Sequence, residues 1–559
     1  MKRSVIAIGL DAADPVLLEK WMSQGHLKNI NQLRQQGTYG RLFNTVNYCG
    51  TPQETSGTER TWVTFLTGCK PNKTGYWGSI KFDSETYKIA HGDLEGSYES
   101  EDYPPFYAVG DDYRVAVMDI PCTALSDRVN GVQILGWGGH FPHTLSHSQP
   151  ANVLPDIVAK YGKNPVLHKD YGYWWDRSYF ERIRRDLKTS VSTRTAICRE
   201  LLQQEDWDLF FTVFGETHSA SHDFWHLSQS DHPLHPHLSQ NVEGDTMLEA
   251  FEDVDRAIGE ILAEAPEDAH ILLFSLHGMG NNGNDMFSMT FLPEMLYRYN
   301  FPGKVAIAPS EVGSPLPPLI TKTRRNTWAG EVWQRKFDDN PVRRLLRPWL
   351  PGRFLKTGNK LDLASPYELT EQSAPLNWMP AMWFTPLWLH MKAFALPAFA
   401  DGGIRINVKG REQHGIVDPS EYEAVCDELT QLVYGLTDAR TGEPIVKNVV
   451  RTRQSASEND SSLPDADLVV IWRDEPTEVV DSPTLGRVGP IPYYRTGGHR
   501  PNGFLMAKGP GITAGSSLPT SQAVDLGPTI LSLLGAPIPE HFDGKPLLNT
   551  APSDLAVTV

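Results

Sequence analysis

The chain has 559 residues, with 51 Lys and Arg against 68 Asp and Glu, which gives a formal net charge of −17. This acidic balance argues against a basic nucleic-acid-binding protein, and the length excludes a small disulfide-stabilised scaffold. The hydrophobic fraction of 40% is sufficient for a large core and argues against disorder.

The chain shows no recognisable targeting segment. Its first apolar stretch is too short for a signal peptide, and Asp11 stands where small residues would lead to a cleavage site. The most apolar later segment, 378–400, is interrupted by three prolines and by His390 and Lys392, so it does not fit a membrane span. Five scattered cysteines without a CxxC pair fit reduced thiols. We therefore expect a soluble, cytoplasmic protein.

Strand-like apolar runs alternate with helical patterns along the chain, which is typical of a mostly parallel sheet with helices on both faces. The first run, 5–10, is followed by Asp14 and Pro15, an N-cap and first-turn proline that predict a helix. The segment 246–263 has apolar residues on one face and predicts another helix. Further buried strands are expected at 115–118, 132–135, 209–214, 271–274, 468–471 and 504–507.

Between residues 296 and 399 this alternation gives way to prolines, tryptophans and a run of basic residues. We expect this segment to be an inserted lid, and segments 1–295 and 400–559 to form one discontinuous catalytic domain. The basic run, Lys322 to Lys360, could hold an anionic substrate or contact a membrane surface, but a solvated face is the simpler interpretation. Its arginines include Arg324, Arg325, Arg343, Arg344, Arg347 and Arg353.

Residues of metal-binding types follow several of the predicted strands. In an open α/β sheet, polar residues at the carboxyl ends of the strands surround the ligand site. A lone histidine there is more often structural, but four separate segments deliver imidazole or carboxylate groups to one predicted edge, so we expect a metal site. These residues are Asp11 after the first strand, His218 and His222 after 209–214, His277 after 271–274, and His499 before 504–507.

The spacing of His218 and His222 is i, i+4, which on a helical turn places both rings on one side and lets them chelate one ion. The same stretch contains four more histidines, and we expect most of them to face solvent. These are His226, His232, His235 and His237.

Thr58 lies in a polar loop directly before an apolar helical segment. Its hydroxyl would lie near the partially positive N-terminus of that helix, which suits a nucleophile that attacks an anionic ester. Simple helix capping is the other interpretation of this threonine.

Several short blocks, in their order and spacing, resemble the alkaline phosphatase superfamily, especially its type I phosphodiesterase/nucleotide pyrophosphatase branch of phosphohydrolases. The resemblance is spread over nearly the whole chain. It implies a three-layer alkaline-phosphatase-like α/β fold with a mostly parallel central sheet. The blocks are Ile8 to Asp11, Thr58 to Gly68, Phe214 to His222, Ser275 to Gly278, Gly403 to Asn407, Gly498 to Pro501 and Val524 to Thr529.

The resemblance also implies a chemistry. In that family a Thr or Ser nucleophile is bound to one of two divalent ions, usually zinc, and forms a covalent phospho-enzyme; two ions can stabilise both the attacking and the leaving oxygen. The implied substrate is a small anionic ester. By position, Thr58 matches the nucleophile, Asp11 and His277 match ligands of the ion that activates it, and His218, His222 and His499 match the ligands of the other ion.

Two positions depart from the pattern of the family. Leu276 and His218 each stand where an Asp ligand is usual, which leaves Asp11 as the one carboxylate among these positions. Either one ion is bound weakly or not at all, or another carboxylate substitutes, with Glu216 as the first candidate and Asp285 as the second. The histidine-rich set favours zinc, manganese or iron over calcium or magnesium.

We therefore predict a metal-dependent hydrolase of phosphate esters that acts on diesters before monoesters. A transferase that passes the phospho group to a hydroxyl acceptor is one alternative. A catalytically impaired homologue that keeps a metal for binding is the other.

Overall fold

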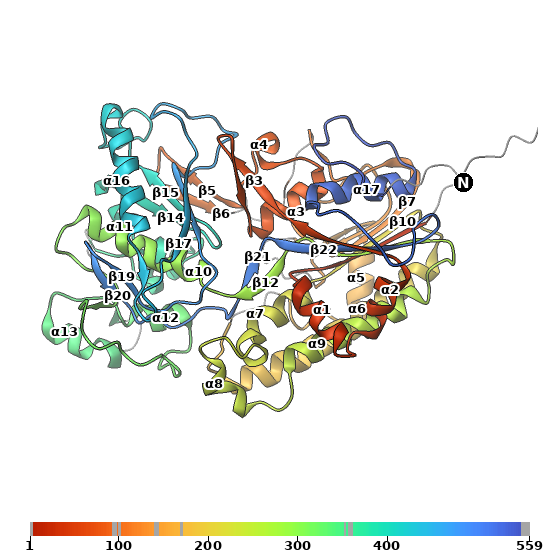
Figure 1. Ribbon diagram of the computed structural model, residues 1–559, viewed down its shortest axis with the longest axis horizontal. Helices are drawn as coiled ribbons and strands as arrows, with labels where there is room; N and C mark the ends of the chain where they lie inside the picture. Colours follow the sequence, from red (N-terminus) through yellow and green to blue (C-terminus); the bar gives the residue numbers. More distant parts are fainter. Residues whose placement is uncertain are drawn as a thin grey trace, which may run out of the picture.

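The computed structural model describes residues 4–91, 98, 102–138, 145–167, 172–350, 354–355 and 362–548. Its largest element is a nine-stranded sheet (Figure 1). Strands β11, β1, β10, β7 and β8 are parallel to one another, whereas β22 runs antiparallel between β11 and β2. In spatial order the strands are β23 (Ser516–Ser517), β2 (Thr38–Phe43), β22 (Asn502–Lys508), β11 (His270–Ser275), β1 (Val5–Leu10), β10 (Leu209–Phe214), β7 (Gly110–Met118), β8 (Val129–Leu135) and β9 (His147–Gln149).

Helices cover both faces of this sheet. Alternate residues of β1 point to opposite faces, so Ile6 and Ile8 join one apolar core while Val5 and Ala7 join another. The first core is closed by α1 (Pro15–Ser23), α2 (Lys28–Gln36), α6 (Arg177–Gln204), α7 (Glu216–Ser228) and α9 (Thr246–Leu262). The second is closed by α3 (Thr58–Thr67) and α17 (Leu526–Leu534). The predicted α/β class, with a mostly parallel sheet between helical layers, is confirmed.

Several predicted elements are present where the sequence indicates them. The side chain of Asp14 accepts a hydrogen bond from the Leu17 amide at 2.9 Å and Pro15 opens α1. The predicted strand 468–471 is wrong in one respect, because β18 (Leu468–Trp472) belongs to a different, antiparallel sheet. Its five residues are all buried since it pairs on both sides, and such a run looks the same in either sheet.

A second lobe contains two four-stranded antiparallel sheets and lies on the left in Figure 1. One consists of β14 (Ala393–Leu396), β15 (Gly402–Ile406), β18 and β17 (Val446–Arg451), and the other of β13 (Pro309–Ser310), β20 (Gly486–Val488), β19 (Val480–Ser482) and β16 (Thr437–Asp438). The expected domain boundaries at 295 and 400 stay a prediction. Because residue 400 falls between the paired strands β14 and β15, we propose that this lobe, here called the cap lobe, comprises residues 284–494.

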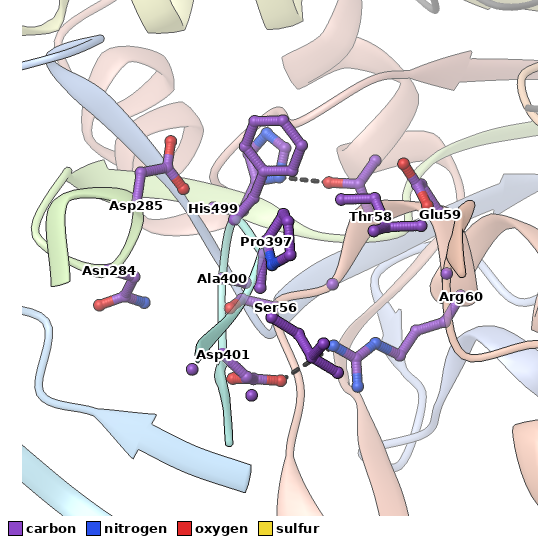
Figure 2. A pocket seen from close by; sticks show the side chains of 18 of the residues that line it. Ser56, Thr58, Glu59, Arg60, Asn284, Asp285, Pro397, Ala400, Asp401 and His499 are labelled. Carbon is purple, nitrogen blue, oxygen red and sulfur yellow. Dashed lines mark hydrogen bonds and ion pairs between the residues drawn. The ribbon is translucent and has the colours of Figure 1, made fainter. Parts of the chain in front are cut away.

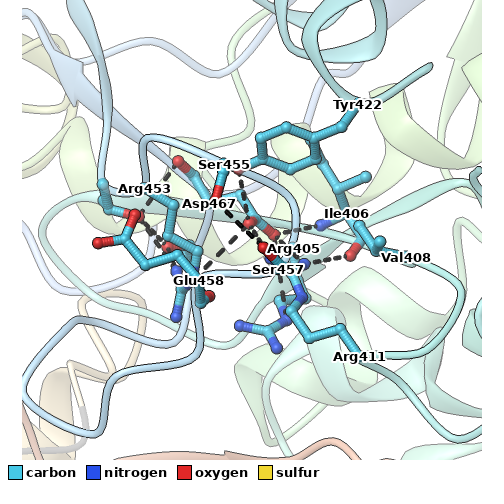
Figure 3. Close-up of polar contacts among 12 residues, drawn as sticks. Arg405, Ile406, Val408, Arg411, Tyr422, Arg453, Ser455, Ser457, Glu458 and Asp467 are labelled. Atoms are coloured by element: carbon cyan, nitrogen blue, oxygen red, sulfur yellow. Dashed lines mark hydrogen bonds and ion pairs between the residues drawn. The ribbon is translucent and has the colours of Figure 1, made fainter. Parts of the chain in front are cut away.

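A buried ionic cluster holds β15 and β18 of the cap lobe together (Figure 3). Asp467 accepts hydrogen bonds from Arg411 at 2.6 Å and from the Tyr422 hydroxyl at 2.9 Å. Burial alone would raise the pKa of Asp467, but the nearby Arg411, Arg405 and Arg453 outweigh it and hold that pKa below its usual value. The carboxylate therefore stays charged inside the lobe.

The described part of the basic run is only partly solvated. Arg347 is buried and its Nε lies 2.5 Å from Asp338 Oδ2, whereas Arg324 and Arg344 are exposed. Arg353 lies outside the described residues. No helix in the described ranges is long and apolar enough to span a bilayer.

Candidate active site

Three histidines from two distant parts of the chain meet beyond the carboxyl end of β10. His218 and His222 lie on α7, which begins directly after that strand, and His499 lies on β21 (Gly497–Arg500). The three Nε2 atoms are 3.1, 3.0 and 3.1 Å apart. Ligand atoms around a tetrahedral zinc ion with bonds of about 2.0 Å are about 3.3 Å apart, so this spacing fits an ion. Within the described ranges, this is the one group of three such side chains able to hold a metal.

The approach of β21 to α7 explains why the rings converge. His222 donates from Nδ1 to the Gly497 carbonyl at 2.6 Å, which leaves its Nε2 lone pair facing the other two histidines. A Cβ at Gly497 would lie 2.2 Å from the Ser221 carbonyl oxygen, and one at Gly498 would lie 2.9 Å from Cα of the facing residue 282. Only glycine at both positions allows β21 to lie this close.

Thr58 is the first residue of α3 and its hydroxyl contacts Nδ1 of His499 (Figure 2). The His499 ring therefore connects Thr58 on one side to the histidine cluster on the other. Gly57 is the N-cap of α3, and no side chain caps this helix. The alternative interpretation of Thr58 as a capping residue is therefore wrong.

Asp11 and His277 lie beside this cluster, at the ends of β1 and β11. Asp11 is fully buried; its Oδ1 is 3.3 Å from His277 Nε2 and accepts a hydrogen bond from the Trp62 indole at 3.2 Å. The centroids of the His277 and His499 rings are 4.8 Å apart. Leu276 is buried in the apolar core under α3 and α17 and has no atom that could bind a metal ion. The structure thus brings together all six matched positions, with one carboxylate among them.

The two candidate substitute carboxylates are engaged elsewhere. Both oxygens of Glu216 accept hydrogen bonds from Arg194 Nε, at 3.0 and 3.1 Å, and Arg194 also binds Asp119 at 2.8 Å. Asp285 accepts from Asn282 at 3.0 Å and from Arg495 at 3.1 Å. The structure places Glu216 in a buried ion pair and Asp285 in the cavity wall, not among the histidines.

A cavity of about 580 Å³ opens in front of Thr58 and the histidines. Its far wall comes from the cap lobe and is rich in aromatic rings. Trp378 and Tyr494 stack there with centroids 5.1 Å apart, and the Trp378 and Phe399 centroids are 6.1 Å apart. Trp77 and Phe82, from the segment after α3, line the same space. The cavity therefore has a polar end at Thr58 and the histidines and an aromatic end at the cap lobe.

Sequence reasoning missed the ion pair that joins the nucleophile helix to the cap lobe. Arg60 Nη2 lies 2.9 Å from Asp401 Oδ2 (Figure 2). Arg60 Nη1 also donates to the Tyr48 hydroxyl at 2.5 Å. Arg60 is only two residues after Thr58, which was a usable signal. Its partner is 341 residues away along the chain, so no local pattern could have identified it.

Two of the four neighbouring histidines are buried, which corrects the expectation that most of this stretch faces solvent. His226 Nδ1 lies 3.0 Å from the Thr496 hydroxyl, and His232 Nδ1 accepts a hydrogen bond from the Leu234 amide at 3.1 Å. His226 is buried because α7 is enclosed between α6, α9 and β21, whereas His232 lies beyond the end of α7 and packs against the rings of His226 and Tyr493. Burial lowers the pKa of His232 to about 3, and that of His226 well below its usual value.

Acid should therefore destabilise the fold through His232. The pKa of His232 is about 3 in the folded chain and 6.5 in the unfolded chain. At pH values between these two, the unfolded state binds more protons, so the stability of the fold decreases as the pH falls from 6.5 towards 3. We expect the free energy of unfolding to fall by about 2 kcal/mol from this residue between pH 7 and pH 5. Urea unfolding at several pH values would measure it. His232→Asn should flatten the pH dependence, and His237→Asn, at an exposed position, should not; an unchanged slope in His232→Asn would refute the assignment.

Comparison with known proteins identifies the family. Residues 5–327 match the family model described as type I phosphodiesterase / nucleotide pyrophosphatase. No curated protein matches the chain significantly.

Similar solved structures include phosphonoacetate hydrolase from Sinorhizobium meliloti 1021 in complex with phosphonoformate, with 13% identity, 96% of each chain covered and a TM-score of 0.47. Murine ectonucleotide pyrophosphatase / phosphodiesterase 5 has 12% identity, 96% of each chain covered and a TM-score of 0.48. Alkaline phosphatase PafA has 12% identity, 98% of each chain covered and a TM-score of 0.47. The family match covers more than half of the chain, which therefore belongs to the type I phosphodiesterase/nucleotide pyrophosphatase family.

Proposed function

We propose that this protein is a metal-dependent hydrolase of phosphate esters that prefers diesters to monoesters. Its family supports a phosphate ester hydrolase. One observation carries the proposal further: the Thr58 hydroxyl, at the start of α3, contacts a histidine whose other nitrogen belongs to a three-histidine cluster. A nucleophile, a metal-binding group and a cavity are thus in one place.

His218, His222 and His499 are the residues that would hold the ion, and three histidines with an open fourth position are typical of catalytic zinc. A divalent ion there would supply Lewis acidity to a phosphoryl oxygen. Manganese and iron also accept imidazole ligands, so both are alternatives to zinc at this site. With its Nε2 on the ion, His499 would carry its proton on Nδ1 and would orient Thr58 by donating to its oxygen.

Thr58 is the proposed nucleophile. The Thr58 hydroxyl gives up its proton to solvent as Oγ1 forms a bond to phosphorus, and the bond from phosphorus to the leaving alcohol oxygen breaks as that oxygen takes up a proton. A water molecule then attacks phosphorus and the bond to Oγ1 breaks; one water proton returns to Oγ1, and the product leaves as a phosphate monoester. The helix N-terminus under Thr58 favours the negative charge of the transferred group.

The lining of the cavity supports a diester. The two arginines in its wall are each paired with a carboxylate, Arg60 with Asp401 and Arg495 with Asp285. Lys81 is the third basic residue of the lining, but the lining also contains the carboxylates of Glu59, Asp285, Asp401 and Asp465, so it adds little net positive charge for the dianion of a monoester. The aromatic wall of the cap lobe offers apolar area to the second substituent that only a diester carries.

A panel of nitrophenyl esters tests this function: bis-nitrophenyl phosphate, nitrophenyl phosphate and nitrophenyl sulfate, each before and after chelation and zinc readdition. We expect kcat/KM for the diester to exceed that for the monoester by about tenfold or more, with little sulfate turnover. Chelation should abolish turnover and zinc should restore it. Faster hydrolysis of the sulfate, or diester turnover that survives complete metal removal, would refute the proposal.

A further inference from the structure

The cap lobe exposes a group of large apolar side chains around one short helix. Twelve large hydrophobic side chains are exposed in the described residues, and five of them fall between 342 and 354. Trp349 is 75% exposed and Leu345 is 74% exposed. The group lies in and just after α13 (Pro341–Leu346) and is called the α13 patch: Val342, Leu345, Leu346, Trp349 and Phe354.

The spacing of these residues directs them to one side. Val342, Leu345 and Leu346 are separated by three and four positions, so they share one face of α13, and Trp349 follows three residues later. In Figure 1 this helix lies at the outer end of the cap lobe, away from the nine-stranded sheet. Clustered exposed apolar residues of this kind mark an interaction surface.

The segment that carries the α13 patch is rich in basic residues. Residues 321–350 contain eight Lys and Arg against three Asp and Glu, in a chain whose net charge is −17. Lys322, Arg324 and Arg344 are exposed, and the Arg324 guanidinium lies over the Trp349 ring, 5.0 Å from its centroid. Exposed Trp and Leu next to Arg and Lys are typical of segments that lie in the interface of an anionic membrane.

We propose that the α13 patch docks this protein on an anionic lipid surface. Negative lipid head groups would attract the arginines, and the Trp349 and Leu345 side chains would enter the boundary between head groups and acyl chains. A protein partner with an acidic surface would satisfy the arginines, but it would also need a groove shaped for a nearly fully exposed tryptophan. A bilayer accepts both groups without such a shape. The acidic remainder of the molecule would be repelled, so only this end would face the membrane.

Docking there would act close to the candidate active site. Arg325 Nη2 donates to the carbonyls of Arg347, Pro348 and Leu350, at 3.2, 3.2 and 2.8 Å. These bonds tie the turn after α13 to the segment that enters α12 (Trp328–Trp333), and Trp328 lines the cavity. The inference does not depend on the proposed function, because it concerns where the protein binds and not what it hydrolyses.

Co-sedimentation of the full chain with vesicles tests the proposal. We expect binding to vesicles of equal parts phosphatidylcholine and phosphatidylglycerol, weak binding to phosphatidylcholine alone, and loss of binding at high salt. The variant Leu345→Glu/Trp349→Glu should weaken binding about a hundredfold. The variant Arg324→Gln/Arg344→Gln should weaken it about thirtyfold.

The matched control is Val16→Glu/Val312→Glu, which replaces two residues that are 53% and 55% exposed elsewhere and adds the same charge. This control should bind like the parent chain, and all variants should keep the melting temperature of the parent. No binding to the anionic vesicles, or equal weakening by the control, would overturn the proposal. The proposal would also be overturned if sedimentation velocity showed that Leu345→Glu/Trp349→Glu splits an oligomer while vesicle binding persists. The α13 patch would then contact a second copy of the chain.

Discussion

Replacing Thr58 by alanine should lower kcat for phosphate diesters by about a thousandfold or more. The variant lacks the oxygen that would bond to phosphorus. It keeps the histidines in place, because the Thr58 hydroxyl contacts Nδ1 of His499 and not the Nε2 atom that faces His218 and His222. Steady-state kinetics on a nitrophenyl diester, with metal content measured on the same samples, would show activity lost and metal retained.

Two further variants show whether the hydroxyl itself matters. Thr58→Ser keeps an oxygen in the same place and should recover a large part of the activity. Thr64→Ala removes a half-buried threonine of the same helix that does not line the cavity, and it should behave like the parent enzyme. A Thr58→Ala enzyme that kept a tenth or more of the parental kcat would show that water attacks phosphorus directly, and Thr58 would then only position another group.

The second large effect concerns the number of ions. We expect one equivalent of zinc per chain, held by the three histidines. The variant His222→Ala should lose both this zinc and all activity. Beside this cluster, at the positions of Asp11, Leu276 and His277, Asp11 is the single carboxylate. Its Oδ1 already accepts a hydrogen bond from the Trp62 indole, and Leu276 contributes only apolar surface. Two divalent charges beside one carboxylate would be poorly neutralised.

Metal analysis after dialysis measures this stoichiometry without relying on turnover. His277→Ala should keep one equivalent, since His277 is not part of the three-histidine group and its Nε2 lies 3.3 Å from Asp11 Oδ1. His237→Ala, an exposed histidine of the same stretch, is the control and should match the parent chain. Two equivalents in the parent that fall to one in His277→Ala would contradict the expectation and restore a two-ion centre.

Local chemistry explains which parts of this molecule were predictable from sequence. The Asp14 and Pro15 pair opens α1 through bonds within four residues, and the i, i+4 spacing places His218 and His222 on one side of α7 without any tertiary information. Membership of strand 5–10 in the large sheet followed in the same way from its apolar run and the loop after it.

The rest depends on partners distant in the chain. Glu216 stands two residues before a metal-type histidine, and nothing near it in sequence shows that Arg194 on another helix takes both its oxygens. Strand 468–471 is as apolar as a strand of the central sheet, yet it pairs with β15 and β17. The cap lobe's aromatic wall is assembled from segments around residues 328, 378, 399 and 494, so its position over the cavity could only be found in three dimensions.

The place of β22 in the sheet has a consequence for biosynthesis. Among the strands that the structure describes, β2 joins the parallel strands through β22, whose Ala507 pairs with Thr38 about 470 residues earlier in the chain. At ribosomal speeds of about 5–20 residues per second, β2 waits roughly half a minute or longer for this strand, and the edge of β11 waits roughly ten seconds or longer. Nascent chains therefore carry open strand edges that invite pairing with other chains, and we expect this protein to need chaperones during synthesis more than its finished, closed sheet suggests.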